Sequence, residues 1–315
     1  MSLKYAIEVY ELLDDAKITG ERVKEYLNQI SKETKITVET VQGEKGSTDF
    51  IQIIIPGENG KQNGGVAPTL GIVGRLGGIG ARPETKGFVS DGDGALSAVA
   101  IAAKLLTMAK KGDQLAGDVI ISTHICPDAP TQPHDPVPFM GSPVDILTMN
   151  QYEVFAEMDA ILSIDTTKGN RITNHRGFSI TPTVKEGYIL RISEDLLDIY
   201  QQTSGRLPVT IPITMQDITP YGNGIYHLNS ILQPAVATDA PVVGVAITTE
   251  SAVAGSGSNA THLADIDTVI RFSIEAAQRF GKDNCQFYDT EEYERILELY
   301  GSLKRFQTLG QEATK

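Results

Sequence analysis

Short apolar runs alternate with helix-length segments along the middle of this chain, and this alternation constrains the fold more than any other feature. The run "GDVIISTHI" over residues 117–125 follows an apolar helical segment at about 94–110, and "MDAILSID" over 158–165 follows one at about 144–157. Strands that alternate with helices in this way form largely parallel sheets with helices on both faces. The sequence therefore predicts an α/β fold of three layers, α/β/α, with a mixed, mainly parallel sheet.

The flanking segments extend the same pattern. Two amphipathic helices are expected over 3–14 and 20–33, the second opened by Thr19, and a further helix is expected over 290–303. No linker-like segment, repeat or low-complexity tract interrupts the 315 residues, which predicts one domain over 1–315. Further strands are expected over 35–41, 49–57, 69–77, 187–192, 207–214 and 241–249, and further helices over 193–204 and 264–281.

Carboxylates occupy the expected strand and helix ends. Asp91 and Asp93 stand at the start of the helix over 94–110, Asp128 comes three residues after the strand over 117–125, and Asp165 closes the next strand. An acid at a helix start is most often an N-cap. Acids from three separate segments, however, converge on one edge of a parallel sheet, where ligands gather. Close carboxylates need a compensating charge, so the pattern predicts a cation site.

Composition excludes several classes of partner. The 27 Lys and Arg residues against 40 Asp and Glu residues leave a net charge of −13, which would repel a nucleic-acid backbone. No run of about 18 apolar residues and no secretory signal is readable, so no membrane partner is expected and the protein is expected in the cytoplasm. Its two cysteines, Cys126 and Cys285, lack metal or disulfide spacing and are expected to be reduced.

The order of these features resembles the co-catalytic zinc exopeptidase superfamily, the aminopeptidases and carboxypeptidases that bind two zinc ions on an α/β/α sheet. More closely, "VYELLDDAKITGERVKEYL" and "THICPDAPTQPHDP" resemble a bacterial and archaeal family of about this length with no assigned function. The resemblance places Asp91 at the bridging aspartate of the superfamily, Asp128 at its paired glutamates and Asp165 at its strand-terminal acid ligand. It implies a zinc-exopeptidase-like fold and a metal site built on these three residues.

The sequence departs from the superfamily pattern at other ligand positions. Arg75 stands where the first metal-binding histidine is expected, and a guanidinium does not ligate metal. Pro127 stands at the general-base glutamate and has no titratable group. The final loop contains His262, which is expected to be a displaced substitute ligand, and Glu250, which is expected to line the site together with Arg75. These donors are too few for two zinc ions and favour Mn²⁺ or Mg²⁺ over Zn²⁺, or no metal at all.

Two functions remain open at this stage. One is a metal-dependent hydrolase that acts on a C–N bond of an amide or peptide-like small molecule. The other is a non-catalytic protein that keeps the exopeptidase fold and binds a small molecule or peptide, and a homo-oligomer is compatible with either. Asp93 and His124 are expected to line the site, although a histidine in an apolar strand is more often a hydrogen-bonded core residue. Arg75 is expected to form an ion pair with Asp91 or Asp165.

Overall fold

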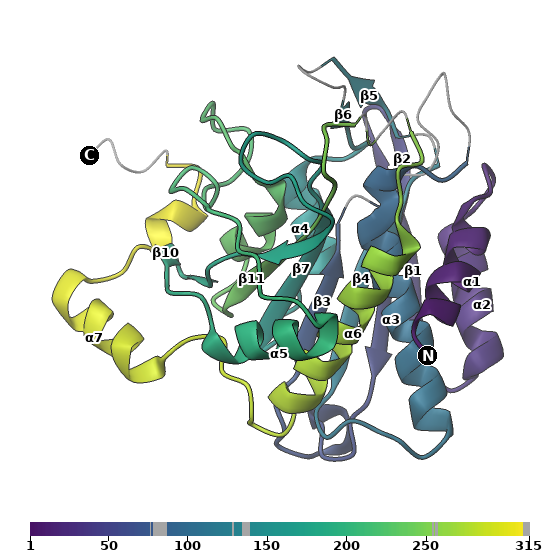
Figure 1. The fold of residues 1–315 in the computed structure, drawn as a ribbon, viewed down its shortest axis with the longest axis horizontal. Helices are drawn as coiled ribbons and strands as arrows, with labels where there is room; N and C mark the ends of the chain where they lie inside the picture. Colours follow the sequence, from purple (N-terminus) through teal and green to yellow (C-terminus); the bar gives the residue numbers. More distant parts are fainter. Residues whose placement is uncertain are drawn as a thin grey trace.

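A nine-stranded sheet organises the chain in the computed structural model, which describes residues 1–75, 77, 87–127, 129–133, 139–253, 255 and 258–310 (Figure 1). The strand order is β1-β2-β4-β3-β7-β11-β9-β10, and β8 also pairs with β11. The central strands β4, β3, β7 and β11 are parallel, and antiparallel strands flank them on both sides. The strands are β1 Lys35–Gly43, β2 Gly46–Ile55, β3 Leu70–Gly74, β4 Val119–Ile125, β7 Ala160–Thr166, β8 Gly177–Ile180, β9 Val184–Lys185, β10 Tyr188–Ile189 and β11 Val242–Thr248; a separate hairpin contains β5 Thr131–Gln132 and β6 Phe139–Met140.

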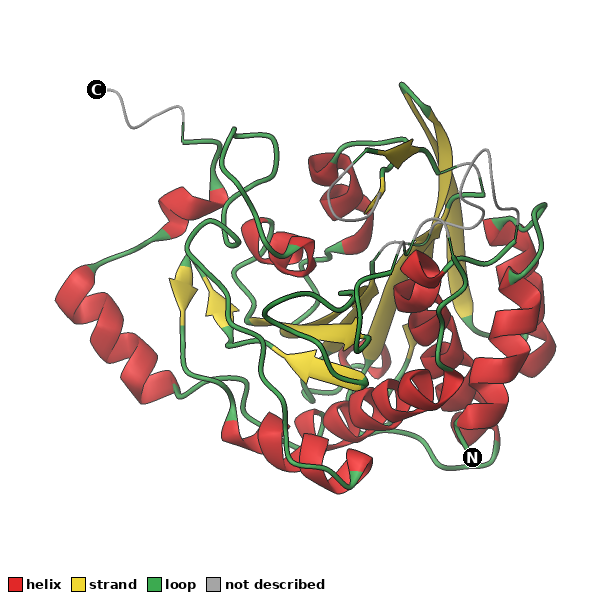
Figure 2. Cartoon of the chain, turned by 45° about the horizontal axis from the view of Figure 1, so that its top comes forward, coloured by secondary structure: helices red, strands yellow, loops and turns green. Residues whose placement is uncertain are grey.

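Helices cover both faces of this sheet, so the mixed, mainly parallel α/β/α arrangement predicted from the sequence is confirmed. Helices α1, α2, α3, α5 and α6 pack on one face, and α4 and the short helix η3 pack on the other (Figures 1 and 2). The helices are α1 Leu3–Leu13, α2 Gly20–Ile30, α3 Asp93–Lys110, α4 Ile146–Glu153, α5 Glu194–Ser204, α6 Leu263–Phe280 and α7 Thr290–Tyr300, with 3₁₀ turns η1 Lys61–Asn63, η2 Ser90–Gly92, η3 Ser230–Val236 and η4 Lys304–Gln307.

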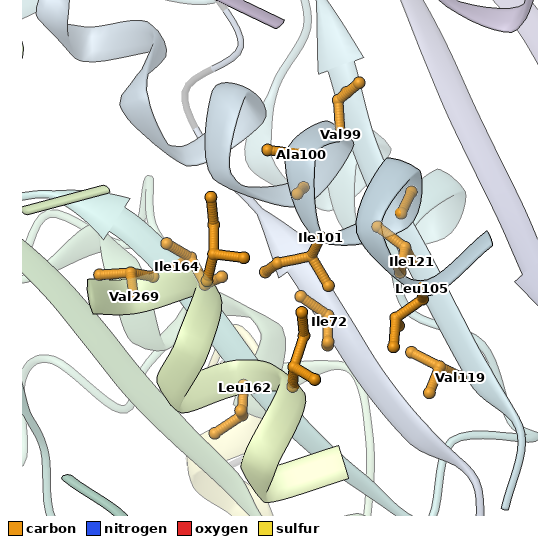
Figure 3. Close-up of a cluster of buried hydrophobic side chains, with 14 of the residues drawn as sticks. Ile72, Val99, Ala100, Ile101, Leu105, Val119, Ile121, Leu162, Ile164 and Val269 are labelled. Carbon is orange, nitrogen blue, oxygen red and sulfur yellow. The ribbon is translucent and has the colours of Figure 1, made fainter. Parts of the chain in front are cut away.

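Helix α3 forms the centre of the core. Its small and branched side chains pack on Ile72, Ile121 and Leu162 of the parallel strands, and Val269 of α6 closes the cluster (Figure 3). Among the described residues, Ser90–Lys110 is the one helical stretch whose length and mean hydropathy of 1.3 would suffice to cross a membrane. Within the fold 83% of its most apolar window is buried, which is typical of a core helix.

Two short segments differ from the pattern-based expectation. Residues 207–214 form no strand and contribute only an isolated bridge between Thr210 and Ile180. Pro208 and Pro212 explain this, because proline lacks the N–H donor that a sheet ladder requires. The strand beside β11 is instead β8, whose four residues were too short a run to be recognised as a strand.

Candidate functional site at the carboxyl edge of the sheet

The start of α3 is held directly against the carboxyl ends of β3 and β7. The backbone N–H of Arg75, just after β3, donates to the carbonyl of Ile164 in β7 at 2.8 Å. The hydroxyl of Thr166 donates to the carbonyl of Ser90 at 2.9 Å, which ties the end of β7 to the turn before α3. The carboxylates that flank these contacts therefore lie at the same edge of the sheet.

Gly94 makes this close approach feasible. A Cβ atom at this position would lie 2.1 Å from the carbonyl oxygen of Arg75 and 2.8 Å from that of Ile164. Both obstacles are backbone atoms of buried strand ends, so neither can turn aside as a flexible side chain would. The glycine between the two acids and the apolar helix is thus a packing requirement of the edge.

We expect Gly94→Ala to lower the free energy of unfolding by about 1–3 kcal/mol, because the added methyl group overpacks the contact between α3 and the strand ends. Urea denaturation measures the change. Lys110→Ala, on an exposed position of the same helix, should stay within about 0.5 kcal/mol of the wild type. Equal stability of Gly94→Ala and Lys110→Ala would show that the helix start can move away from the strands.

Asp91 and Asp93 are both buried at the start of α3. Burial raises the pKa of Asp91 to about 6, against the opposing effects of the Lys168 ammonium and a backbone N–H of Met140. Burial likewise raises the pKa of Asp93 to about 6, against Lys168 and the Thr261 hydroxyl, while the Asp91 charge adds to the rise. The Thr261 hydroxyl donates to Asp93 Oδ1 at 2.6 Å, and Lys168 Nζ lies 3.6 Å from Asp93 Oδ2.

Asp165 is buried near the end of β7. The Ser230 hydroxyl donates to its Oδ2 at 2.9 Å, and the N–H of Thr166 donates to its Oδ1 at 2.6 Å. Burial raises the pKa of Asp165 to about 7; these two hydrogen bonds oppose the rise, the Asp91 charge adds to it, and Arg75 opposes it from a longer distance. Asp91 and Asp165 are therefore near enough to repel each other when both are ionised.

Arg75 does not form the ion pair expected from the sequence, and that expectation is wrong. Its Nη1 lies 3.0 Å from Glu153 Oε2, and its Nη2 donates to Asn150 Oδ1. Arg75 is 3% exposed and Glu153 0% exposed, so this is a buried pair. Arg75 meets Glu153 because β3, which precedes Arg75, lies beside β4 in the sheet, and α4 covers this end of the sheet. Glu153 is the last residue of α4 and contacts the guanidinium.

His124 belongs to the same network. The N–H of Gly77 donates to its Nε2 at 3.4 Å, which makes Nε2 the acceptor of the ring. The proton is thus assigned to Nδ1, which lies 2.6 Å from Glu153 Oε1 and donates to it. Glu153 therefore holds both Arg75 and His124, and we define these three residues as the Arg75 network.

The remaining residues proposed from the sequence lie elsewhere. His262 is the exposed N-cap residue of α6, and Glu250 is exposed just after β11. Asp128 lies outside the described residues. In the part of the chain that the structure describes, no group of three or more His, Cys, Asp and Glu side chains could hold a metal ion. The described residues thus provide no all-protein zinc site, and the link between Asp91 and Asp165 is that the charge of Asp91 raises the pKa of Asp165.

Three residues of this edge were not identified from the sequence. Glu153 closes a short helix and Ser230 opens η3, and neither position carries a recognisable motif. Lys168 could have been identified from the sequence, because it comes three residues after Asp165, the acid at the end of β7. Loops that follow the strands of an α/β sheet commonly contact ligands.

Comparisons with known proteins give one family match and a similar solved structure. One family model, described as "Protein of unknown function (DUF1177)", matches residues 39–310. The comparison with curated proteins finds no match. Among solved structures, leucine aminopeptidase from Caenorhabditis elegans is similar with a TM-score of 0.52 and 14% identity. The similarity covers 85% of this chain and 65% of that chain, and at this identity it shows a common fold and nothing of the reaction.

Proposed function

This chain belongs to the DUF1177 family and has an aminopeptidase-like fold, and we propose that it is a divalent-cation-dependent hydrolase acting on a C–N bond of an amide or peptide-like small molecule. One observation carries the proposal: Asp91 and Asp165 are buried carboxylates at the same edge of the sheet, and among the described residues neither has an ion-pair partner. Their pKa values are raised to about 6 and about 7. Within the described ranges, no Lys, Arg or His nitrogen lies within ion-pair distance of either carboxylate.

The donor atoms at this edge suit a hard cation. Mg²⁺ keeps several waters and commonly uses only one or two protein carboxylates, so two described ligands are compatible with it, whereas structural zinc requires four N, S or O ligands. We propose Mg²⁺ or Mn²⁺ in preference to Zn²⁺. When bound, such an ion would polarise a carbonyl oxygen or lower the pKa of a water. Ser230 and Thr166 would hold the Asp165 carboxylate in one orientation toward it.

The second candidate is a non-catalytic protein that binds a small molecule or peptide at the same edge. The Arg75 network favours it, because a buried pair of compensating charges occupies the strand end where the superfamily places a metal-binding histidine. Pro127, at the position of the general base, favours it as well. In this case Asp91 and Asp165 would contact the ligand directly.

Thermal unfolding with and without MnCl₂ at pH 8 tests the cation site. At a hundred-fold excess over its dissociation constant, an ion that binds only the folded state adds roughly 2.7 kcal/mol of stability. We expect Mn²⁺ to stabilise the wild type by this amount and to leave the stability of Asp165→Asn unchanged. Asp118→Asn is the matched control, because Asp118 is equally buried but lies at the opposite end of the parallel strands, where it accepts the N–H groups of Gly57 and Gln62.

Hydrolysis of a panel of dipeptides and amino-acid amides then separates the two candidates. The hydrolase requires Mn²⁺-dependent turnover that Asp91→Asn and Asp165→Asn abolish and Asp118→Asn retains. Binding of these compounds without turnover would favour the second candidate. Tight, chelator-resistant zinc in the purified protein would contradict the proposed preference for a hard cation.

A further inference from the structure

Helix α7 lies at the periphery of the molecule, apart from the helices that cover the sheet (Figures 1 and 2). All of its residues are described, and Tyr293 is the one whose side chain is buried. Isolated helices shorter than about 12 residues are marginally stable in water, so a helix of 11 residues depends on the packing of an apolar face. A single buried side chain provides little of that packing.

One side of α7 is apolar and open to solvent. Ile296 precedes Leu299 and Tyr300 by three and four residues, so the three side chains are adjacent on the helix surface. Leu299 is 53% exposed and Tyr300 is 75% exposed, whereas Ile296 is half-buried. Contiguous exposed apolar side chains, unlike single ones, mark surfaces that bind other proteins. We define these three residues as the α7 face.

Both ends of α7 are attached to the rest of the chain. In its first turn, Glu292 Oε2 lies 2.9 Å from Arg191 Nε, on the segment before α5. Just after the helix, Lys304 Nζ lies 2.6 Å from Asp239 Oδ2, on the segment before β11. These contacts hold the α7 face in one orientation, and a preformed surface binds a partner without the entropic cost of ordering a loop.

Unpaired charges of opposite sign flank the α7 face. Glu294 lies five residues before Leu299, and Arg305 lies five residues after Tyr300. Both flanking side chains are exposed, and within the described ranges neither forms an ion pair. Two antiparallel α7 helices, related by a two-fold axis near Leu299 and Tyr300, place Glu294 of each chain at the end where the other chain carries Arg305. The flanking charges are therefore complementary to those of a second copy.

We propose that the α7 face is a dimer interface, occupied by the α7 face of a second copy of this chain in antiparallel orientation. With a net charge of −13, two copies repel each other on average, so their association has to depend on apolar contact and on locally opposite charges. The α7 face and its flanking charges provide both. One helix face buries less surface than a tight interface does, so we expect a dissociation constant in the micromolar range. This inference concerns assembly and does not depend on the proposed reaction.

Sedimentation velocity of the full chain at micromolar concentrations measures this association. We expect a monomer–dimer equilibrium for the wild type and a dissociation constant raised at least about ten-fold in Tyr300→Glu, because a charge replaces an aromatic anchor at the centre of the interface. Tyr226→Glu is the matched control, since Tyr226 is 74% exposed but lies on the loop before η3, and it should dimerise like the wild type. A wild type that stays monomeric, or a Tyr300→Glu variant that dimerises as the wild type does, would overturn the inference.

Charge reversal tests the antiparallel orientation. Glu294→Lys places two cations opposite each other in the dimer, and Arg305→Glu places two carboxylates opposite each other, so each variant alone should dimerise more weakly than the wild type. In an equimolar mixture the introduced charges face each other, as do the native ones, so dimers should form again. Both side chains are exposed, so both variants should fold, which thermal unfolding verifies. A mixture that dimerises no better than the separate variants would contradict the proposed pairing.

Discussion

Arg75→Leu should lower the free energy of unfolding by about 3–5 kcal/mol, because it leaves the buried carboxylate of Glu153 without its cation. Denaturant unfolding at neutral pH measures this change. Arg295→Ala is the matched control, since Arg295 forms an ion pair of similar length, 2.9 Å, with Glu298, but both side chains are about two-thirds exposed. Its removal should change stability by less than about 0.5 kcal/mol.

A double variant distinguishes a lost ion pair from lost packing. Glu153→Gln keeps an oxygen that can accept the proton of His124 Nδ1 but removes the charge that Arg75 requires. Combined with Arg75→Leu, it leaves no unpaired charge, so the double variant should be more stable than the sum of the single losses predicts. Additive losses would mean that Arg75 contributes through the packing of its side chain on Met149 and Asn150 rather than through its charge.

Asp165→Asn should stabilise the cation-free protein by a few kcal/mol at pH 8 and have little effect near pH 4. The pKa of Asp165 is raised in the folded state, from the ordinary 3.8 to about 7, so the folded protein holds this proton more tightly than the unfolded chain. The resulting stability is complete below pH 3.8 and is lost as the pH rises to 7, at about 1.4 kcal/mol per pKa unit. An asparagine at this position carries no charge, so the variant does not lose this stability as the pH rises.

Thermal unfolding of both proteins in chelator over pH 4 to 8 measures the difference. The control again is Asp118→Asn, for which we expect a loss of stability at pH 8, since it replaces a carboxylate that accepts two backbone N–H groups at 2.8 and 2.9 Å. A destabilised Asp165→Asn at pH 8 would show that a group outside the described residues already compensates its charge. Asp91→Asn should also stabilise the cation-free protein at pH 8, but by less, because the pKa of Asp91 is raised less than that of Asp165.

The local pattern of the sequence was sufficient to predict the layers of this fold. Apolar runs such as 119–125 and 160–166 differ in length and period from the helix that contains Val99 and Leu105, and burial on both faces of a parallel sheet requires such runs. The same reasoning brought Asp91 and Asp165 to one edge, since parallel strands end on the same side. These conclusions depend on the local pattern of apolar residues and on the rule that parallel strands end at the same edge of a sheet. Both can be applied to the sequence alone.

Only the tertiary structure decided which charges meet. Arg75 and Glu153 are far apart in the chain, and their contact depends on β3 lying beside β4 while α4 covers that end of the sheet. Charge alone would pair Arg75 equally well with Asp165, so electrostatics could not select the partner. The inward direction of Lys168 depends in the same way on loop contacts with β11. Side-chain partners are set by packing between distant elements, whereas the elements themselves follow from local periodicity.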